Sequence, residues 1–144
     1  MTKDEATIRN ILDDRAKALY AKNSDQLLAH NAEGSFSFDL DPPLQHKGSR
    51  ADAKAGLEAW FATWKGPIGW ENRDVAVFAD GTIAFSTALA RISGAKTDGE
   101  EISLWFRNTN GHRKENGTWK LVHLHSSVPY AMDGSNKACI DLKP

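Results

Sequence analysis

The chain has 144 residues and a formal net charge of −1, with 26% charged and 40% hydrophobic residues. This composition is typical of a globular domain, so one domain spanning residues 1–144 is expected. It excludes a basic nucleic-acid footprint, and no run approaches the ~18 apolar residues of a membrane span. A single cysteine, Cys139, excludes an internal disulfide. Because the first residues lack a signal-peptide pattern, the expected location is cytoplasmic.

Three helices are predicted in the first half of the chain. Thr2-x-x-Glu5 has the spacing of a capping box, and apolar residues then recur at helical spacing over residues 8–20. Ser24 is the expected cap of a short second helix, and Ser49 is the expected cap of the third. The third helix ends at Gly66-Pro67 and carries an apolar stripe of Ala53, Leu57, Trp60, Phe61 and Trp64.

Strands are predicted from the remaining patterns. Residues 36–40 alternate between apolar and polar before Pro42-Pro43 ends the strand. Residues 68–79 and 82–92 meet at Asp80-Gly81, a hairpin signal, and strands over 100–108 and 118–128 follow, separated by a polar stretch. Helices followed by meandering strands predict an α+β domain whose curled antiparallel sheet leaves a wedge for a small-molecule pocket.

The last strand carries two histidines. Strand side chains alternate between faces, which predicts one shared face for Trp119, Leu121, His123, His125 and Ser127. Two imidazoles and a hydroxyl suit a pocket wall or a polar interface better than a dry core, because buried polar groups need partners.

This strand also carries a family resemblance. Residues 117–129, Gly-Thr-Trp-Lys-Leu-Val-His-Leu-His-Ser-Ser-Val-Pro, with residues 132–135 and 141–144, resemble the nuclear transport factor 2-like superfamily, and within it the SnoaL-like and ketosteroid-isomerase-like bacterial proteins. The association domain of a calmodulin-dependent kinase is similar in the same strand. The resemblance implies a cone-shaped fold, with a curled antiparallel sheet wrapped around three N-terminal helices, and a homodimer paired through the sheet. It names no substrate, because this fold hosts isomerases, cyclases, dehydratases and non-catalytic modules.

The resemblance to ketosteroid isomerases implies a catalytic base at Asp39, within the segment that ends at Gly48. Asp41 is the alternative if the register slips. The position of the oxyanion-binding tyrosine holds Arg15 and that of the second donor holds Ser103, so true steroid isomerase activity is not expected. If Phe36, Phe38 and Leu40 form the buried face, Asp39 points away and is a solvated carboxylate instead.

A second candidate wall lies on the strand over residues 100–108. Glu101, Ser103, Trp105 and Arg107 share one face, and the kinase association domain implies basic pocket groups there. Arg91 is expected to join them, so that Arg91 and Arg107 bind a carboxylate; the alternative is a Glu/Arg pair on a wet sheet face. Trp60, Trp64 and Trp105 are the expected cavity lining.

Neither a metal nor a cofactor is expected. His123 and His125 lie on one predicted face, but a zinc site needs a third protein ligand, and nothing requires Asp39 or Glu101 to supply it. We therefore predict a protein that binds a small, partly apolar organic molecule. It either performs cofactor-independent isomerisation, cyclisation or dehydration, with Asp39 as base and His123 or His125 as proton partner, or serves as a non-catalytic ligand-binding or dimerisation module.

Overall fold

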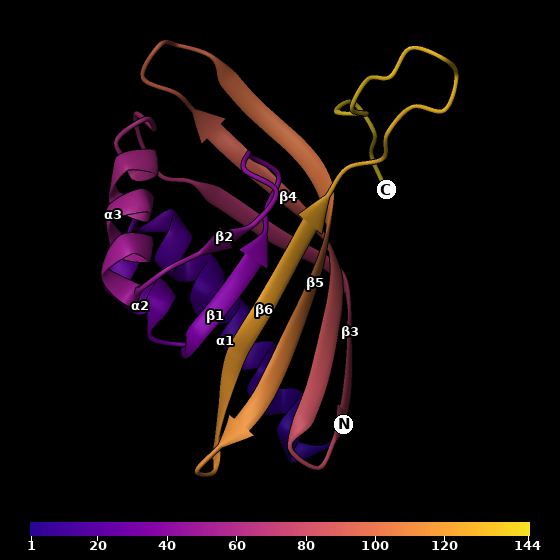
Figure 1. The fold of residues 1–144 in the computed structure, drawn as a ribbon. Helices are drawn as coiled ribbons and strands as arrows, with labels where there is room; N and C mark the ends of the chain where they lie inside the picture. The colour runs from indigo at the N-terminus through magenta and orange to yellow at the C-terminus, as the bar shows by residue number, and fades with distance from the viewer.

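The computed structural model describes all 144 residues and contains three helices and six strands (Figure 1). The α+β class is therefore confirmed. None of the helices combines the length and the apolar character needed to cross a membrane. The elements in chain order are α1 Lys3–Tyr20, α2 Ser24–Leu28, β1 Asn31–Phe38, β2 His46–Lys47, α3 Arg50–Phe61, β3 Gly69–Asp80, β4 Ile83–Ala95, β5 Glu101–Glu115 and β6 Thr118–Ser127.

Helix starts follow the predicted caps in two of the three helices. The Thr2 hydroxyl accepts a hydrogen bond from the Glu5 backbone N–H at 3.1 Å. Ser49 forms a complete capping box with Asp52 at the start of α3. At α2 the cap is Asn23 rather than Ser24, because the Ser24 hydroxyl donates to Glu58 and Asn caps as well as Ser does.

The sheet is mixed rather than antiparallel. Its strand order is β2-β1-β6-β5-β4-β3, and every neighbouring pair is antiparallel except β1 and β6, which run parallel. These two strands are far apart in the sequence, so no hairpin turn fixes their relative direction. The hairpin predicted at Asp80-Gly81 does join β3 to β4, and Gly81 has the positive φ of 62° that such a turn requires.

Strand β5 is longer than predicted. The polar residues 109–115, expected to form a loop, continue the strand and pair with both β4 and β6. A polar stretch can hold this position because several of its side chains are buried and hydrogen-bonded to neighbouring strands.

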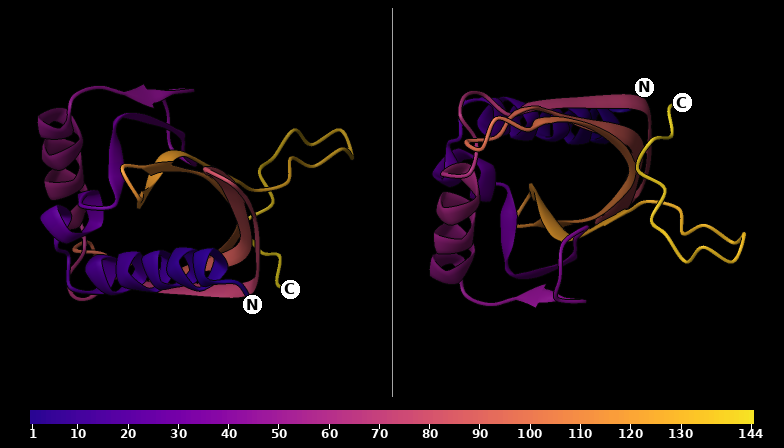
Figure 2. Two further views of the ribbon diagram at one scale, coloured as in Figure 1. Left: turned by 90° about the horizontal axis from the view of Figure 1, so that it is seen from below. Right: turned by 90° about the horizontal axis from the view of Figure 1, so that it is seen from above.

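The sheet curls around the helices, as the two end-on views show (Figure 2). Its concave, inner face is turned toward α1 and α3, and the C-terminal tail lies on the convex, outer side. Two apolar clusters hold this arrangement. One contains nine buried residues around Phe61, Trp64 and Phe106, and the other contains five, Ile8, Ile11, Val77, Ala84 and Trp119.

The accessible surface of the chain is larger than its size predicts. It is 8786 Å², against about 7,400 Å² for a typical monomer of 15.9 kDa. A curled sheet with an extended tail exposes this additional area. The two faces of the sheet differ: the inner face is largely buried, and the outer face carries exposed side chains such as Phe78 and Phe85.

Candidate functional site

A row of buried polar side chains crosses the inner face of the sheet. It lies between the two apolar clusters, since Ser86 on β4 stands between Ala84 of one cluster and Ala90 of the other. The Asn108 amide donates to Ser126 at 3.0 Å, and the Asn110 amide donates to Asn108 at 2.8 Å and to Ser86 at 3.4 Å. His112 completes the row, with its Nε2 3.0 Å from the Ser86 hydroxyl.

The Ser86 hydroxyl links the His112 ring to this row. It accepts a hydrogen bond from Asn110, and its single hydrogen can be donated to His112 Nε2. In the tautomer that receives this bond, Nε2 is an acceptor and Nδ1 of the neutral ring carries the hydrogen. Nδ1 is enclosed and has no hydrogen-bond partner. A buried donor without a partner costs about 1–3 kcal/mol, which a ligand oxygen would offset.

His112 is neutral at physiological pH. Its exposed fraction is 1%, and burial, together with the positive charge of Arg15, lowers its pKa to about 4. The ring can therefore donate or accept a hydrogen bond at pH 7. It cannot serve there as a cationic acid.

Arg15 brings a positive charge from α1 to this interior. Its side chain is half-buried, and Nη1 donates to the Leu27 carbonyl at 3.0 Å and to Asn31 Oδ1 at 2.7 Å. Desolvation lowers the pKa of Arg15 to about 10, and the charge of Asp39 partly opposes that shift. No carboxylate forms an ion pair with Arg15.

Asp39 follows β1 on the side of the inner face. Ser37 is paired with Leu124, and its hydroxyl donates to Asp39 Oδ2 at 2.7 Å. Phe36 and Phe38 are paired with His123 and His125 and lie on the outer face, so the alternative in which these phenylalanines point inward does not apply. Asp39 itself is exposed and lies at the rim.

A β-bulge reverses the predicted faces of β6. Gly111 pairs with His123 and His112 pairs with Leu121, so Val122 is an extra residue. Trp119 and Leu121 remain on the inner face, but beyond the bulge Leu124 and Ser126 take it. The prediction of one face for Trp119, Leu121, His123, His125 and Ser127 is therefore wrong.

The two histidines instead belong to an aromatic group on the outer face. The ring of His123 lies 4.4 Å from that of Phe36 and 4.6 Å from that of Phe38. His123 Nδ1 is 2.9 Å from the Phe36 carbonyl oxygen, and the His125 ring is 5.4 Å from that of Phe38. The structure does not bring either histidine together with Asp39 on one face.

The predicted substrate wall on β5 also lies on the outer face. Arg107 Nε donates to the Ser127 hydroxyl at 3.2 Å, on the opposite side from the Asn108–Ser126 bond. Arg91 Nε is 3.3 Å from a carboxylate oxygen of Glu71, and its guanidinium lies 5.8 Å from the Trp105 ring. The alternative of a cross-strand Glu/Arg pair thus occurs, with Glu71 rather than the exposed Glu101.

Two more of the predicted lining residues fill the core. Trp64 is a buried member of the nine-residue cluster, and Trp60 packs against that cluster with its ring 5.7 Å from that of Trp64. Both tryptophans therefore belong to the apolar core beside α3.

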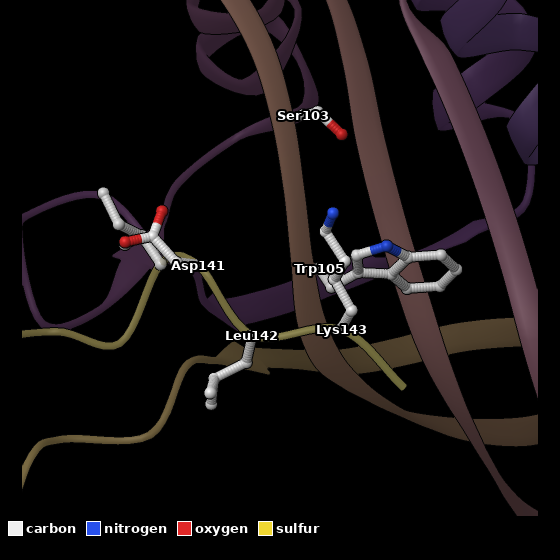
Figure 3. Close-up of a pocket in the computed structure, with 6 residues that line it drawn as sticks. Ser103, Trp105, Asp141, Leu142 and Lys143 are labelled. Atoms are coloured by element: carbon white, nitrogen blue, oxygen red, sulfur yellow. The ribbon is translucent and has the colours of Figure 1, made fainter.

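A hollow of about 340 Å³ opens on the outer side, between β5 and the C-terminal tail. Ser103 and Trp105 of β5 and residues 140–143 of the tail line it, and Figure 3 shows Asp141 and Leu142 to the left of Ser103 and Trp105. Two of the predicted substrate residues, Ser103 and Trp105, therefore meet here. Charged, polar and apolar groups alternate around the hollow.

One group of metal-ligand type occurs elsewhere. Ligand atoms of Asp39, Asp41 and His46 lie within 4.8 Å of one another at the exposed rim. His46 Nε2 is 3.3 Å from Asp41 Oδ1. Exposed acidic groups commonly approach one another without an ion, and this trio includes neither His123 nor His125.

Sequence reasoning missed the polar row. The signal was present in the alternation Asn108-x-Asn110-x-His112, which is strand-like. Asn108 nevertheless ends the predicted strand, and the polar stretch that contains Asn110 and His112 is expected only to separate two strands. Ser86 and Ser126 carry no signal of their own, since their partners come from other strands.

Comparisons with known proteins agree with this fold. The family model of the SnoaL-like domain matches residues 8–131. A nuclear transport factor 2-like protein of unknown function from Pseudomonas putida KT2440 is 29% identical, with a TM-score of 0.87 over 100% of this chain and 99% of that one. No curated protein matches the sequence.

Two more distant solved structures share the fold. A provisionally assigned dehydratase of the same superfamily from Streptomyces avermitilis is 16% identical, with a TM-score of 0.76 over 89% of this chain and 97% of that one. A provisionally assigned calcium/calmodulin-dependent protein kinase II association domain from Xanthomonas campestris is 19% identical, with a TM-score of 0.71 over 88% and 86%. With the family model covering most of its length and the curled sheet in place, this chain belongs to the SnoaL-like family of the nuclear transport factor 2-like superfamily.

Proposed function

We propose that the chain binds a small, partly apolar organic molecule against the inner face of the sheet and performs cofactor-independent acid–base chemistry on it. The observation that carries this proposal is the buried polar row. Ser86, Asn108, Asn110, His112 and Ser126 occupy positions where aliphatic side chains would complete a continuous core between the two apolar clusters. Burying polar groups costs free energy unless each is paired, and His112 Nδ1 in this row has no partner within the chain, which favours a functional role.

Three groups take roles in the proposed chemistry. Asp39 lies at the rim and accepts a hydrogen bond from the Ser37 hydroxyl. It is the base that removes a proton from a carbon or oxygen atom of the substrate. Arg15 and the Nδ1–H of His112 are donors that stabilise the negative charge that then develops. Isomerisation, cyclisation and dehydration all begin with such a proton removal. The provisional assignment of one distant relative as a dehydratase is compatible with the last of these reactions.

The test is a fragment screen observed through the side-chain amide signals of Asn108 and Asn110 in ¹⁵N-labelled protein. Fragments that bind the inner face should shift these signals. Asn110→Leu should remove the binding, because leucine fills the row with an apolar group. Thr109→Leu is the matched control, since Thr109 is the neighbouring residue on the outer face. Fragments that bind both variants equally would contradict the proposal.

The second candidate function is assembly through the outer face. It is favoured by exposed apolar side chains there: the Phe78 and Phe85 rings stack at 4.8 Å yet are 57% and 47% exposed. We propose that two copies of the chain pair through this face and cover these rings, since large exposed apolar groups commonly mark an interface.

Sedimentation velocity at micromolar concentration tests this second proposal. A dimer mass is expected, and Phe85→Glu should convert it to a monomer because a charge would be buried in the interface. Leu44→Glu is the control, since Leu44 is 97% exposed in the loop between β1 and β2. A monomer mass for the unmodified protein would exclude the dimer.

A further inference from the structure

The guanidinium of Arg15 is a partly desolvated cation without a counter-ion. The ion pairs of the structure join other groups, and no carboxylate oxygen lies within 4.0 Å of Arg15. The negative charge of Asp39 acts on it only from a greater distance. Charges removed from water are normally paired, because an isolated one is costly.

One nitrogen of this guanidinium, Nη1, is hydrogen-bonded within the chain, and the other two nitrogens are not. Nη1 is held by the Leu27 carbonyl and by the Asn31 side chain. Nε and Nη2 have no hydrogen-bond partner, and neither is a fully enclosed atom. These two groups form one edge of the planar fork, the geometry that receives the two oxygens of a carboxylate.

We propose that the molecule bound at the inner face carries a carboxylate, which the free edge of Arg15 receives. This inference rests on the proposed function, because it names the class of ligand for the same site. The ligand anion supplies the missing counter-ion. The contacts to Leu27 and Asn31 hold the guanidinium ready for it, so less conformational entropy is lost on binding.

His112 supports the same class of ligand. Its Nδ1 is buried without a partner and is a donor in the tautomer in which Nε2 accepts from Ser86, and Arg15 is close enough to act on its charge state. These two donors match a ligand that presents oxygen acceptors, and the exposed Asp39 acts on Arg15 only from beyond 4.0 Å. A cationic ligand would face Arg15 with like charge.

The remainder of the ligand is expected to be apolar and flat. Trp70 is half-buried on the inner face and packs edge-to-face, with ring centroids 5.2 Å apart, against the buried ring of Phe106. Leu124 adds an aliphatic surface beside Ser126 on β6. Small aromatic carboxylates therefore combine the features that this face can recognise.

The experiment compares benzoate with benzamide, which has nearly the same shape but no charge. Both are titrated into the labelled full-length protein while the Asn108 and Asn110 side-chain signals are followed. Benzoate should bind about 10- to 100-fold more tightly than benzamide, the ratio expected for a charge-assisted pair. Arg15→Gln should remove this preference, so that benzoate binds no more tightly than benzamide.

Lys17→Gln is the matched control, because Lys17 is another cation of α1, two residues further along the helix. The preference for benzoate should survive in this variant. Because Arg15→Gln also loses its contacts to Leu27 and Asn31, Arg15→Lys is measured with it; lysine keeps the charge and should retain part of the preference.

The outcomes separate the two proposals. Equal binding of benzoate and benzamide at the inner face would overturn the carboxylate inference alone. A preference for benzoate that persists in Arg15→Gln would overturn the assignment to Arg15. If neither probe shifts the Asn108 and Asn110 signals while both bind elsewhere or not at all, the inner-face site fails and the carboxylate inference fails with it.

Discussion

The side-chain amide of Asn108 donates a 3.0 Å hydrogen bond to the hydroxyl of Ser126 across the inner face of the sheet. Both residues are buried, and the bond links β5 to β6. One residue earlier on β5 the side chains point outward, where Arg107 bonds to Ser127. This relationship fixes which groups of the two strands can meet a ligand between the sheet and the helices, and it excludes His123 and His125 from that group.

Asp39→Asn tests the role of the rim carboxylate. Asparagine keeps the shape and the bond from Ser37 but has no basic lone pair of comparable strength, so turnover of any substrate found should fall by about 10²-fold or more. Binding should persist. Steady-state kinetics with the substrate, alongside Asp41→Asn as the neighbouring control, measures this. Unchanged turnover in Asp39→Asn would remove Asp39 from the mechanism.

Acidification should destabilise the protein through His112. Its pKa is about 4 in the folded protein, against an ordinary value of 6.5, so between these values the unfolded chain binds a proton that the folded chain does not. The free energy of unfolding should therefore fall as the pH decreases from 6.5 to 4, by about 3 kcal/mol from this group.

Urea unfolding at a series of pH values measures this effect. His112→Gln, which cannot be protonated, should lower stability at pH 7 but show a shallower loss on acidification. Ser126→Ala is the control, because it weakens the same polar row without removing a titratable group. If His112→Gln and the unmodified protein lost stability in parallel between pH 6.5 and 4, the buried neutral state of His112 would be wrong.

Deletion of Val122 tests the bulge in β6. Without this residue Leu121 and His123 become neighbours, as their partners His112 and Gly111 already are, so the pairing becomes regular and both faces are retained. The protein is therefore expected to fold, with a loss of about 1–3 kcal/mol from local rearrangement.

Deletion of the exposed His125 is the control, because it removes a residue from a regular part of the strand and moves Ser126 to the outer face. This control should lose more than about 4 kcal/mol or fail to fold. Circular dichroism with urea unfolding distinguishes the two deletions; equal losses would contradict the bulge.

Two glycines are expected to respond in opposite directions to alanine. Gly94 has a φ of 146°, and a Cβ there would lie 2.9 Å from the Pro67 carbonyl oxygen and 3.1 Å from the Trp64 ring. Gly94→Ala should cost about 2–3 kcal/mol. Gly56 lies within α3 with open space around it, so Gly56→Ala should add about 0.5–1 kcal/mol. Thermal unfolding measures both, and a neutral Gly94→Ala would contradict the close contact.

Local patterns were sufficient for the framework of the fold. Capping residues and the Asp80-Gly81 turn each act within a few residues, so a sequence window contains them. The predicted end of the third helix at Gly66-Pro67 is wrong, because α3 ends at Phe61 and Trp64 lies beyond it. Strand pairing between distant parts of the chain could not be predicted from such local patterns. The parallel pairing of β1 with β6 depends on residues far apart in the chain, and no local signal specifies it.

The candidate site depended on strand faces, and these are sensitive to a single inserted residue. Alternation would place His123 correctly only if β6 were regular, whereas the extra Val122 exchanges the two faces. The polar row was missed for a different reason. Buried strand residues are expected to be apolar, and here Asn108, Asn110 and His112 are buried together because they pair with one another and with Ser86 and Ser126.

A crystal structure of the protein with benzoate tests the central claim most directly. The carboxylate is predicted within hydrogen-bond distance of Nε and Nη2 of Arg15, with the ring on the inner face near Trp70 and Phe106. Benzoate bound instead in the outer hollow beside Trp105, with the surroundings of Arg15 unchanged, would contradict the assignment of the inner face as the functional site.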